Sequence, residues 1–187
     1  MNRRSLIAWA ASLYWIPTGS VASSPDPALK HKLQAALAAD SFDDHFAAQV
    51  WLTLMSNRMA AFNSNARERL AILSAVHRHA SAAALPPEMV LSVMHVESHF
   101  RRFAVSSAGA QGLMQIMPFW KQEIGQAQAN LFDIDTNVLF GCTILKHYLD
   151  RESGRWGPAL ARYNGSYGQR QYPEKVMSAW DRYWYPG

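Results

Sequence analysis

Apolar residues recur along this chain at spacings of three and four, in stretches separated by residues that end helices. That spacing is the period of an α-helix, whereas a half-buried strand would alternate. No long alternating run of β-branched residues appears, and alanine, the best helix former, is frequent. The sequence therefore predicts a mainly α-helical fold with little or no sheet. Because 49% of residues are apolar and 17% charged, it also predicts a real core.

Caps and breaks divide this pattern into expected helices. Ser41 with Asp44, and Asn65 with Glu68, have the spacing of capping boxes, and Pro86-Pro87 ends one helix and starts the next. The helices should cover residues 28–39, the stretch opened by Ser41, 65–84, 87–100, 135–151 and 158–164. Their buried faces should include Phe46, Val50, Trp51, Leu54 and Met55 in the second helix and Leu70, Leu73, Val76, Ala80 and Ala83 in the third.

The first 22 residues have the pattern of a secretory signal peptide. Arg3-Arg4 precedes a short apolar stretch, and Ser20-Val21-Ala22 supplies the small residues that a signal peptidase reads. A buried helix of the mature fold is the alternative. We expect cleavage after Ala22 and no remaining segment long enough to span a membrane. The predicted organisation is signal peptide 1–22, N-terminal helical extension 23–85 and catalytic domain 86–187.

Charge and cysteine content exclude several classes of function. Without Arg3 and Arg4, sixteen basic residues face fourteen acidic ones, which is too weak a bias to predict nucleic-acid binding but allows a polyanionic partner. The single cysteine, Cys142, precludes a disulfide within the chain and is expected in the core. His95 and His99 have the spacing of metal ligands but lack a third, so we predict no metal and no cofactor.

One carboxylate lies where an apolar residue is expected. In the helix predicted over 87–100, Glu97 follows Val90, Val93 and Met94 by seven, four and three residues, near the middle of the apolar face. Burial and the negative end of the helix dipole both raise a carboxyl pKa, which suits a general acid. A core glutamate paired with an arginine such as Arg162 is the alternative. The polar side of this helix should hold Ser92, His95 and His99.

The segments that follow supply further candidates. Gln115 is the polar exception in an apolar turn, and it either binds a sugar or satisfies the loop backbone. Met114 is expected in the core, whereas Asn137 can brace loops. Tyr163 ends a helix and is either a cleft residue or an ordinary core tyrosine. Several aromatic residues, most of them expected in packing, cluster near the glycine-rich segments: Trp120, Trp156, Tyr163, Tyr167 and Tyr172.

Taken together, the motifs resemble those of the soluble lytic transglycosylases. The resemblance covers about Pro87 to Val176, in the right order and spacing, and is far more specific than any single motif. Its motifs are Glu97-Ser98-x-Phe100, Ala104-Val105-Ser106-x-x-Gly109-Ala110-x-Gly112-Leu113-Met114-Gln115-Ile116-Met117-Pro118, Asn137 with Gly141 and Tyr148-Leu149, and Ala159-Leu160-Ala161-x-Tyr163-Asn164-x-Ser166.

This resemblance implies a lysozyme-like fold related to goose-type lysozyme. It implies cleavage of peptidoglycan glycan strands at the β-1,4 bond between N-acetylmuramic acid and N-acetylglucosamine, to give 1,6-anhydro ends, in the periplasm of a Gram-negative bacterium. Glu97 would be the catalytic acid and base, without a cofactor. The residues that would line the cleft and bind substrate are Ser106, Met114, Gln115, Tyr163 and Asn164.

Alternatives remain open at this stage. A hydrolytic muramidase would use the same Glu97, and a non-catalytic wall-binding or secretion-accessory protein could share the fold. No second carboxylate stands in a recognisable motif, although retaining and inverting glycosidases need one. Arg102 stands where the family often has proline, and Gly165-Ser166 replaces its common Ala-Gly. Residues 28–84 lie outside the motifs, where they widen the cleft, bind a partner or only pack.

Overall fold

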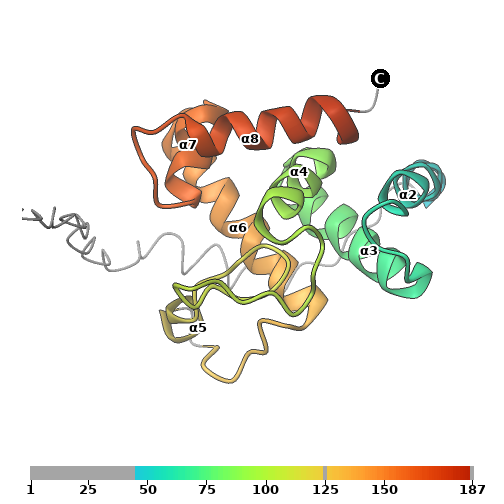
Figure 1. Cartoon of the computed structure of the whole chain (residues 1–187), viewed down its shortest axis with the longest axis horizontal. Helices are drawn as coiled ribbons and strands as arrows, with labels where there is room; N and C mark the ends of the chain where they lie inside the picture. Colours follow the sequence, from blue (N-terminus) through green and yellow to red (C-terminus); the bar gives the residue numbers. More distant parts are fainter. Residues whose placement is uncertain (1–44, 124–125, 186–187) are drawn as a thin grey trace, which may run out of the picture.

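The computed structural model describes residues 45–123 and 126–185, with side chains from residue 49 onward. Within these ranges every regular element is a helix, and the pairing of extended backbone is limited to two isolated bridges, Val105 with Gln111 and Gln111 with Ile116. The expectation of a mainly α-helical fold is thus confirmed. The helices, in chain order, are α2 (His45–Met59), α3 (Ala66–Ala82), α4 (Pro87–Ser98), α5 (Phe119–Glu123), α6 (Ile134–Arg151), α7 (Trp156–Tyr163), α8 (Gln171–Ala179) and the π-helical turn η1 (Trp180–Trp184) (Figure 1).

Helix α4 lies in the middle of the molecule, between α8 on one side and α3 on the other (Figure 1). Of the three residues predicted on its polar side, His99 is exposed, but Ser92 and His95 are buried, so for these two the prediction was wrong. Each finds an internal partner: the Ser92 hydroxyl donates to the Glu88 carbonyl at 2.8 Å, and the Trp184 indole donates to His95 Nδ1 at 3.3 Å. The helix also ends two residues earlier than predicted, since His99 has a left-handed backbone.

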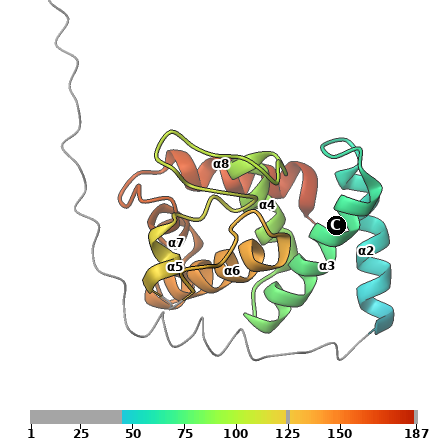
Figure 2. The ribbon, with the colours of Figure 1, turned by 90° about the horizontal axis from the view of Figure 1, so that it is seen from below.

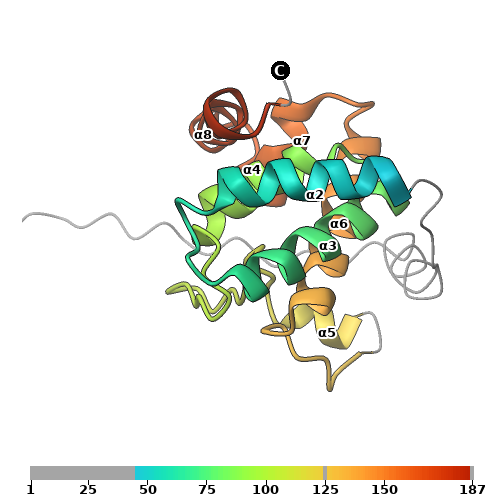
Figure 3. The same ribbon diagram turned by 90° about the vertical axis from the view of Figure 1, so that its right-hand side faces the viewer.

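Helices α2 and α3 pack on one flank of this core, with α2 outermost (Figure 3). The Trp51 indole donates to the Glu88 carboxylate at 2.7 Å and so ties α2 to α4. As predicted, Met55, Leu73, Val76 and Ala80 are buried, but Val50, Leu54 and Leu70 are exposed. The reason is that a helix on the outside of a bundle buries only a narrow stripe, so the flanks of its apolar face stay in solvent.

The cap of α6 differs from the prediction by two residues. Asp133 is the N-cap, because its carboxylate accepts from the backbone N–H of Thr136, three residues on, at 2.9 Å. Asp135, predicted in this role, instead pairs with Arg78 and His79 on α3. These contacts join α3 to α6.

Helix α7 ends where it was predicted to end, but it starts two residues earlier than predicted. The helix begins at Trp156, before Pro158, which fits within the first turn. It ends at Tyr163, with Asn164 as the cap and Gly165 in the left-handed conformation at φ 78°. The backbone N–H of Ser166 then returns to the carbonyl of Ala161 at 2.8 Å, which closes the helix end.

The remaining expectations concern the core and the N-terminus. Cys142 is fully enclosed, which raises its thiol pKa and confirms it as a core residue. The predicted signal peptide and the predicted helix 28–39 lie outside the described residues. In the part of the chain that is described, no helix is both long and apolar enough to cross a membrane. The boundary at residue 85 between extension and catalytic domain stays a prediction.

Candidate active site

A cavity of about 240 Å³ opens beside the C-terminal end of α4. Its walls come from α4, from the long loop between α4 and α5, and from α5, α6 and α7. Glu97 is the only acidic side chain among the described residues that line it. The lining residues are Glu97, Ser106, Ala108, Ala110, Gln115, Ile116, Met117, Trp120, Ile144, Tyr163 and Asn164.

The environment of Glu97 favours the protonated carboxyl. Desolvation by the surrounding apolar side chains raises its pKa to about 7 from 4.5, and a hydrogen bond from Tyr172 opposes part of that shift. In this bond the phenol of Tyr172, on α8, donates to Glu97 Oε1 at 2.6 Å. At neutral pH a substantial fraction of the carboxyl groups is therefore protonated, as a general acid requires.

Tyr163, the last residue of α7, also lines the cavity and contacts the loop between α4 and α5. Its hydroxyl donates to the backbone carbonyl of Met114 at 2.8 Å, and burial raises its pKa well above the ordinary value, with the charge of Glu97 adding to the effect. Tyr163 thus joins α7 to the loop that faces it. Both phenols near Glu97, those of Tyr163 and Tyr172, stay protonated at neutral pH and act as donors.

The alternative of a core glutamate paired with an arginine does not describe this site. Arg162, the partner considered from the sequence, forms an ion pair with the buried carboxylate of Glu152. Its guanidinium also lies 3.7 Å from the ring centre of Tyr167. Within the described residues Glu97 forms no ion pair, and a cavity lies beside it.

The loop between α4 and α5 is held in place by buried polar side chains. Ser98, which follows Glu97 directly in the chain, donates from its hydroxyl to the Leu113 carbonyl at 2.8 Å. From α6, the Asn137 side chain accepts from Met114 N at 2.7 Å and donates to the carbonyls of Gln111 and Leu131 at 2.9 and 2.8 Å. The expectation that Asn137 braces loops is confirmed. These bonds fix the segment that carries the cavity wall.

Ser106, Gln115 and Asn164 all reach the cavity. The Ser106 hydroxyl accepts from the Ala110 backbone N–H at 3.0 Å. The Gln115 amide nitrogen donates to the carbonyls of Ala104 and Gly112 at 3.2 and 2.9 Å, so this side chain does satisfy the loop backbone. Its carbonyl oxygen receives no hydrogen bond from the residues that the structure describes. Gln115 therefore has an acceptor left for a ligand while its nitrogen holds the loop.

Met114 is placed differently from the other five predicted site residues. Its side chain is completely buried and packs on Gly141, where an added Cβ would lie 2.2 Å from the Met114 sulfur. The cavity is not lined by this side chain. Only its backbone takes part, through the carbonyl that accepts from Tyr163. A role of Met114 in substrate contact stays a prediction.

Comparison with known protein families shows to which family the chain belongs. The family described as "Transglycosylase SLT domain" matches residues 74–182, more than half of the sequence. This chain belongs to the SLT transglycosylase family. The resemblance seen in the motifs is thereby confirmed.

The chain is similar in sequence to two known transglycosylases, one from a phage and one from a bacterium. It is 35% identical over 100 residues to the transglycosylase of Enterobacteria phage PRD1, which covers 50% of this chain and 37% of the phage protein. It is 34% identical over 95 residues to membrane-bound lytic murein transglycosylase F of Desulfosudis oleivorans, which covers 48% of this chain and 20% of that protein. The chain thus spans less than half the length of either relative.

Solved structures agree with the fold of the SLT domain. An inactive glutamate-to-glutamine variant of lytic transglycosylase Slt from Pseudomonas aeruginosa matches with a TM-score of 0.51 at 24% identity, over 57% of this chain and 23% of that one. The 70 kDa soluble lytic transglycosylase from Escherichia coli matches with a TM-score of 0.52 at 20% identity, over 83% of this chain and 30% of that one. At these identities the likeness establishes the lysozyme-like fold.

Sequence reasoning missed one residue of this SLT site, Tyr172. It was noted only as one of several aromatic residues, and no helix was predicted for 171–179. The available signal was the spacing of Tyr172, Val176 and Ala179, which share the buried face of α8. That spacing would have turned the phenol toward the core, although nothing in it names Glu97 as the partner.

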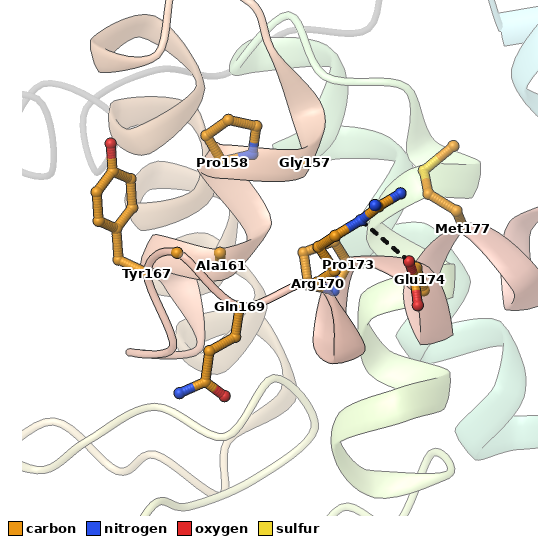
Figure 4. A pocket seen from close by; sticks show the side chains of 10 residues that line it. Gly157, Pro158, Ala161, Tyr167, Gln169, Arg170, Pro173, Glu174 and Met177 are labelled. Atoms are coloured by element: carbon orange, nitrogen blue, oxygen red, sulfur yellow. Dashed lines mark ion pairs between the residues drawn. The ribbon is translucent and has the colours of Figure 1, made fainter.

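A larger groove of about 530 Å³ lies between α7 and α8 of the SLT domain (Figure 4). Its walls are mostly apolar, with Pro158, Pro173 and Met177 among them. The one acidic residue there, Glu174, forms an exposed ion pair with Arg170 at 3.3 Å. Because the carboxylate of Glu174 is exposed and already paired with an arginine, the smaller cavity with Glu97 is the candidate active site.

Proposed function

We propose that this protein is a lytic transglycosylase that cleaves the β-1,4 bond between N-acetylmuramic acid and N-acetylglucosamine in peptidoglycan without using water. The observation that carries the proposal is a single carboxyl in the cavity, that of Glu97, with its pKa raised to about 7. Membership of the SLT family and relatives named as transglycosylases support the substrate and the reaction.

The reaction needs one proton donor that later accepts a proton. Protonated Glu97 gives its proton to the glycosidic oxygen as the bond to the muramoyl carbon breaks. The substrate's own acetamido group stabilises the cationic centre. The Glu97 carboxylate then removes the proton from the muramoyl C6 hydroxyl, whose oxygen closes the 1,6-anhydro ring. Glu97 ends the cycle protonated, as it began.

The residues that the structure describes place no second carboxylate in the cavity, which fits this scheme. Retaining and inverting glycosidases place two carboxyl groups about 5–10 Å apart across the scissile bond. Three acidic residues that follow Glu97 in the chain have other places: Asp133 caps α6, Asp135 pairs with α3, and Glu123 is exposed at the end of α5. None of the three lines the cavity. A substrate that supplies its own nucleophile makes the second carboxylate unnecessary.

Neighbouring residues would orient the reactants. Tyr172 holds Glu97 Oε1 and leaves the other carboxyl oxygen to face the substrate. Ser106, Gln115 and Asn164 present polar groups to the same cavity and would hydrogen-bond the sugars. Trp120 offers an aromatic surface on which a sugar ring can pack. For the cellular location we propose the periplasm, reached through the signal peptide predicted over residues 1–22.

The product of digestion tests the proposed function. Purified peptidoglycan is incubated with the protein in water enriched in ¹⁸O, and the fragments are analysed by mass spectrometry. We expect 1,6-anhydro-muramoyl ends that contain no ¹⁸O. Reducing ends that carry ¹⁸O would identify a hydrolytic muramidase instead. Binding of the wall without any cleavage would favour the non-catalytic wall-binding or secretion-accessory role.

The pH dependence gives a separate prediction that involves Tyr172. Because activity needs the protonated carboxyl, kcat/KM should fall as pH rises through about 7, the pKa of Glu97. The Tyr172 hydrogen bond lowers that pKa, so Tyr172→Phe should move the fall in kcat/KM upward by about one pH unit. Tyr183→Phe, which removes a phenol outside the cavity, is the matched control. A downward shift, or none, would contradict the assigned role of Tyr172.

A further inference from the structure

A second pocket, of about 560 Å³, lies between the α2–α3 turn and the loop that follows α4. Figures 2 and 3 show these two segments on the same side of the molecule. Polar and aromatic side chains share its walls, unlike those of the apolar groove between α7 and α8. The lining residues are Phe62, Asn63, Ser64, Glu68, His99, Phe100, Arg101, Arg102, Phe103, Ala104 and Val105.

The α2–α3 turn is fixed by its own hydrogen bonds. The Asn63 side chain accepts from the Asn65 backbone N–H at 2.9 Å, and the Asn63 carbonyl accepts from the Arg69 guanidinium at 2.8 Å. The Phe62 ring packs against the Phe100 ring, with centroids 6.0 Å apart. Because Phe100 follows Glu97 by three residues, this contact anchors the turn beside the catalytic end of α4. The pocket is therefore preformed, and binding there needs little ordering.

The same loop forms a wall of this pocket and a wall of the active-site cavity. Ala104 lines the pocket, and its carbonyl accepts from Gly112 N at 2.9 Å and from the Gln115 side chain at 3.2 Å. Ser106, two residues on, lines the cavity. A ligand that occupies both this pocket and the active-site cavity thus contacts the loop between α4 and α5 from two sides.

The charge of the pocket favours an anionic ligand. Arg101 and Arg102 each use Nε to hold a backbone carbonyl, at 3.0 Å to Ser98 and 2.7 Å to Phe132. Their terminal nitrogens form no hydrogen bond within the described part of the chain. Against these two guanidinium groups stands one carboxylate, that of Glu68. Two fixed guanidinium forks with free N–H groups are suited to carboxylates.

We propose that this pocket binds the peptide stem of a muramoyl residue next to the cleaved bond. The inference rests on the proposed function and adds a specificity to it. Stem peptides carry free carboxylates, which Arg101 and Arg102 would bind more strongly than the hydroxyl groups of an uncharged sugar. Phe103, 70% exposed, gives an apolar surface for the alanine methyl groups of a stem. The wall at residues 62–68 lies outside the family match at 74–182.

The test compares two substrates: soluble, uncrosslinked glycan strands that carry their stems, and the same strands after an amidase has removed them. Arg101→Gln should raise the KM for stem-bearing strands about fivefold relative to the KM for stripped strands, the effect of losing one partly exposed charge-assisted hydrogen bond. Ser64→Trp, which fills the pocket from its exposed rim, should have the same effect. Arg101→Lys should restore part of the preference.

Arg67→Gln is the matched control, since Arg67 is an exposed arginine on the first turn of α3 that does not line the pocket. It should leave the ratio of the two KM values at that of the parent. If Arg101→Gln and Ser64→Trp change both substrates equally, or neither, the pocket does not bind stems although the proposed function stands. A parent protein that cleaves neither substrate overturns the proposed function and this inference with it.

Discussion

Replacing Glu97 with glutamine should lower kcat on peptidoglycan by about a thousandfold or more, while the affinity for uncut strands stays within about threefold of the parent. Glutamine fills the same volume and can still accept the hydrogen bond that Tyr172 donates to Oε1. It cannot give up a proton to the glycosidic oxygen, nor accept one from the C6 hydroxyl. The proposed mechanism assigns both proton transfers to Glu97, and no other acidic side chain of the described residues lines the cavity, so we expect no second group to replace it.

The same substitution should make the folded protein more stable above neutral pH. The pKa of Glu97 is about 7 in the folded state, against 4.5 for the ordinary group. The folded state therefore binds this proton more tightly, and the parent loses stability as pH rises from about 4.5 to about 7. Glutamine does not ionise, so at pH 8 Glu97→Gln should be more stable by about 3 kcal/mol, and at pH 4 about equal to the parent.

Steady-state kinetics on purified peptidoglycan and urea unfolding at pH 4 and pH 8 check both parts. The exposed Glu174→Gln is the matched control, because this carboxylate is 64% exposed and lies outside the cavity. It should change neither kcat nor the pH dependence of stability appreciably. If Glu97→Gln cleaves peptidoglycan at the parental rate, another residue is the acid.

The second large effect is expected in stability, from Asn137→Ala. This buried side chain accepts from Met114 N and donates to the carbonyls of Gln111 and Leu131. Alanine would leave Met114 N and the Leu131 carbonyl without that partner in the interior, whereas the Gln111 carbonyl keeps the hydrogen bond from Ile116 N at 2.9 Å. At about 1–3 kcal/mol for each of the two groups, partly relieved by water entering the gap, the free energy of unfolding should fall by about 2–4 kcal/mol.

Activity should fall with it, because the loop that Asn137 holds carries Gln115 and the Met114 carbonyl that accepts from Tyr163. Thr143→Ala on the same helix is the matched control. Its buried hydroxyl donates only to the Leu139 carbonyl at 2.8 Å, within α6, and its loss should cost about 1 kcal/mol. Chemical denaturation of both variants measures the difference. Equal losses would mean that Asn137 contributes no more than an ordinary hydrogen bond in α6.

Local chemistry explains which parts of the fold were predictable from sequence. The breaks at Asn65 and Pro87 and the left-handed Gly165 depend on a few neighbouring residues, and the structure has them where they were predicted. The position of Glu97 at the end of its helix was predictable for the same reason. The burial of Ser92 and His95 was not, since it depends on helices that arrive from distant parts of the chain.

In the candidate active site, too, the features that depend on neighbouring residues were predictable, and those that depend on distant helices were not. Ser106, Gln115, Tyr163 and Asn164 belong to contiguous motifs, and the structure gathers them around one cavity with Glu97. Tyr172 comes from a helix 75 residues away, so only the tertiary structure reveals that its phenol contacts the carboxyl. The pocket formed by the α2–α3 turn could not be predicted either, because its two walls meet only in the folded protein.

The protonation state of Glu97 is measured most directly by titrating its side-chain carboxyl carbon by NMR, in protein labelled with ¹³C at glutamate, with Glu97→Gln to assign the signal. We predict a midpoint near pH 7, together with a fall in kcat/KM at the same pH. A midpoint near 4.5, the ordinary value for a glutamate, would mean that the carboxyl is ionised at neutral pH and would contradict its role as the acid.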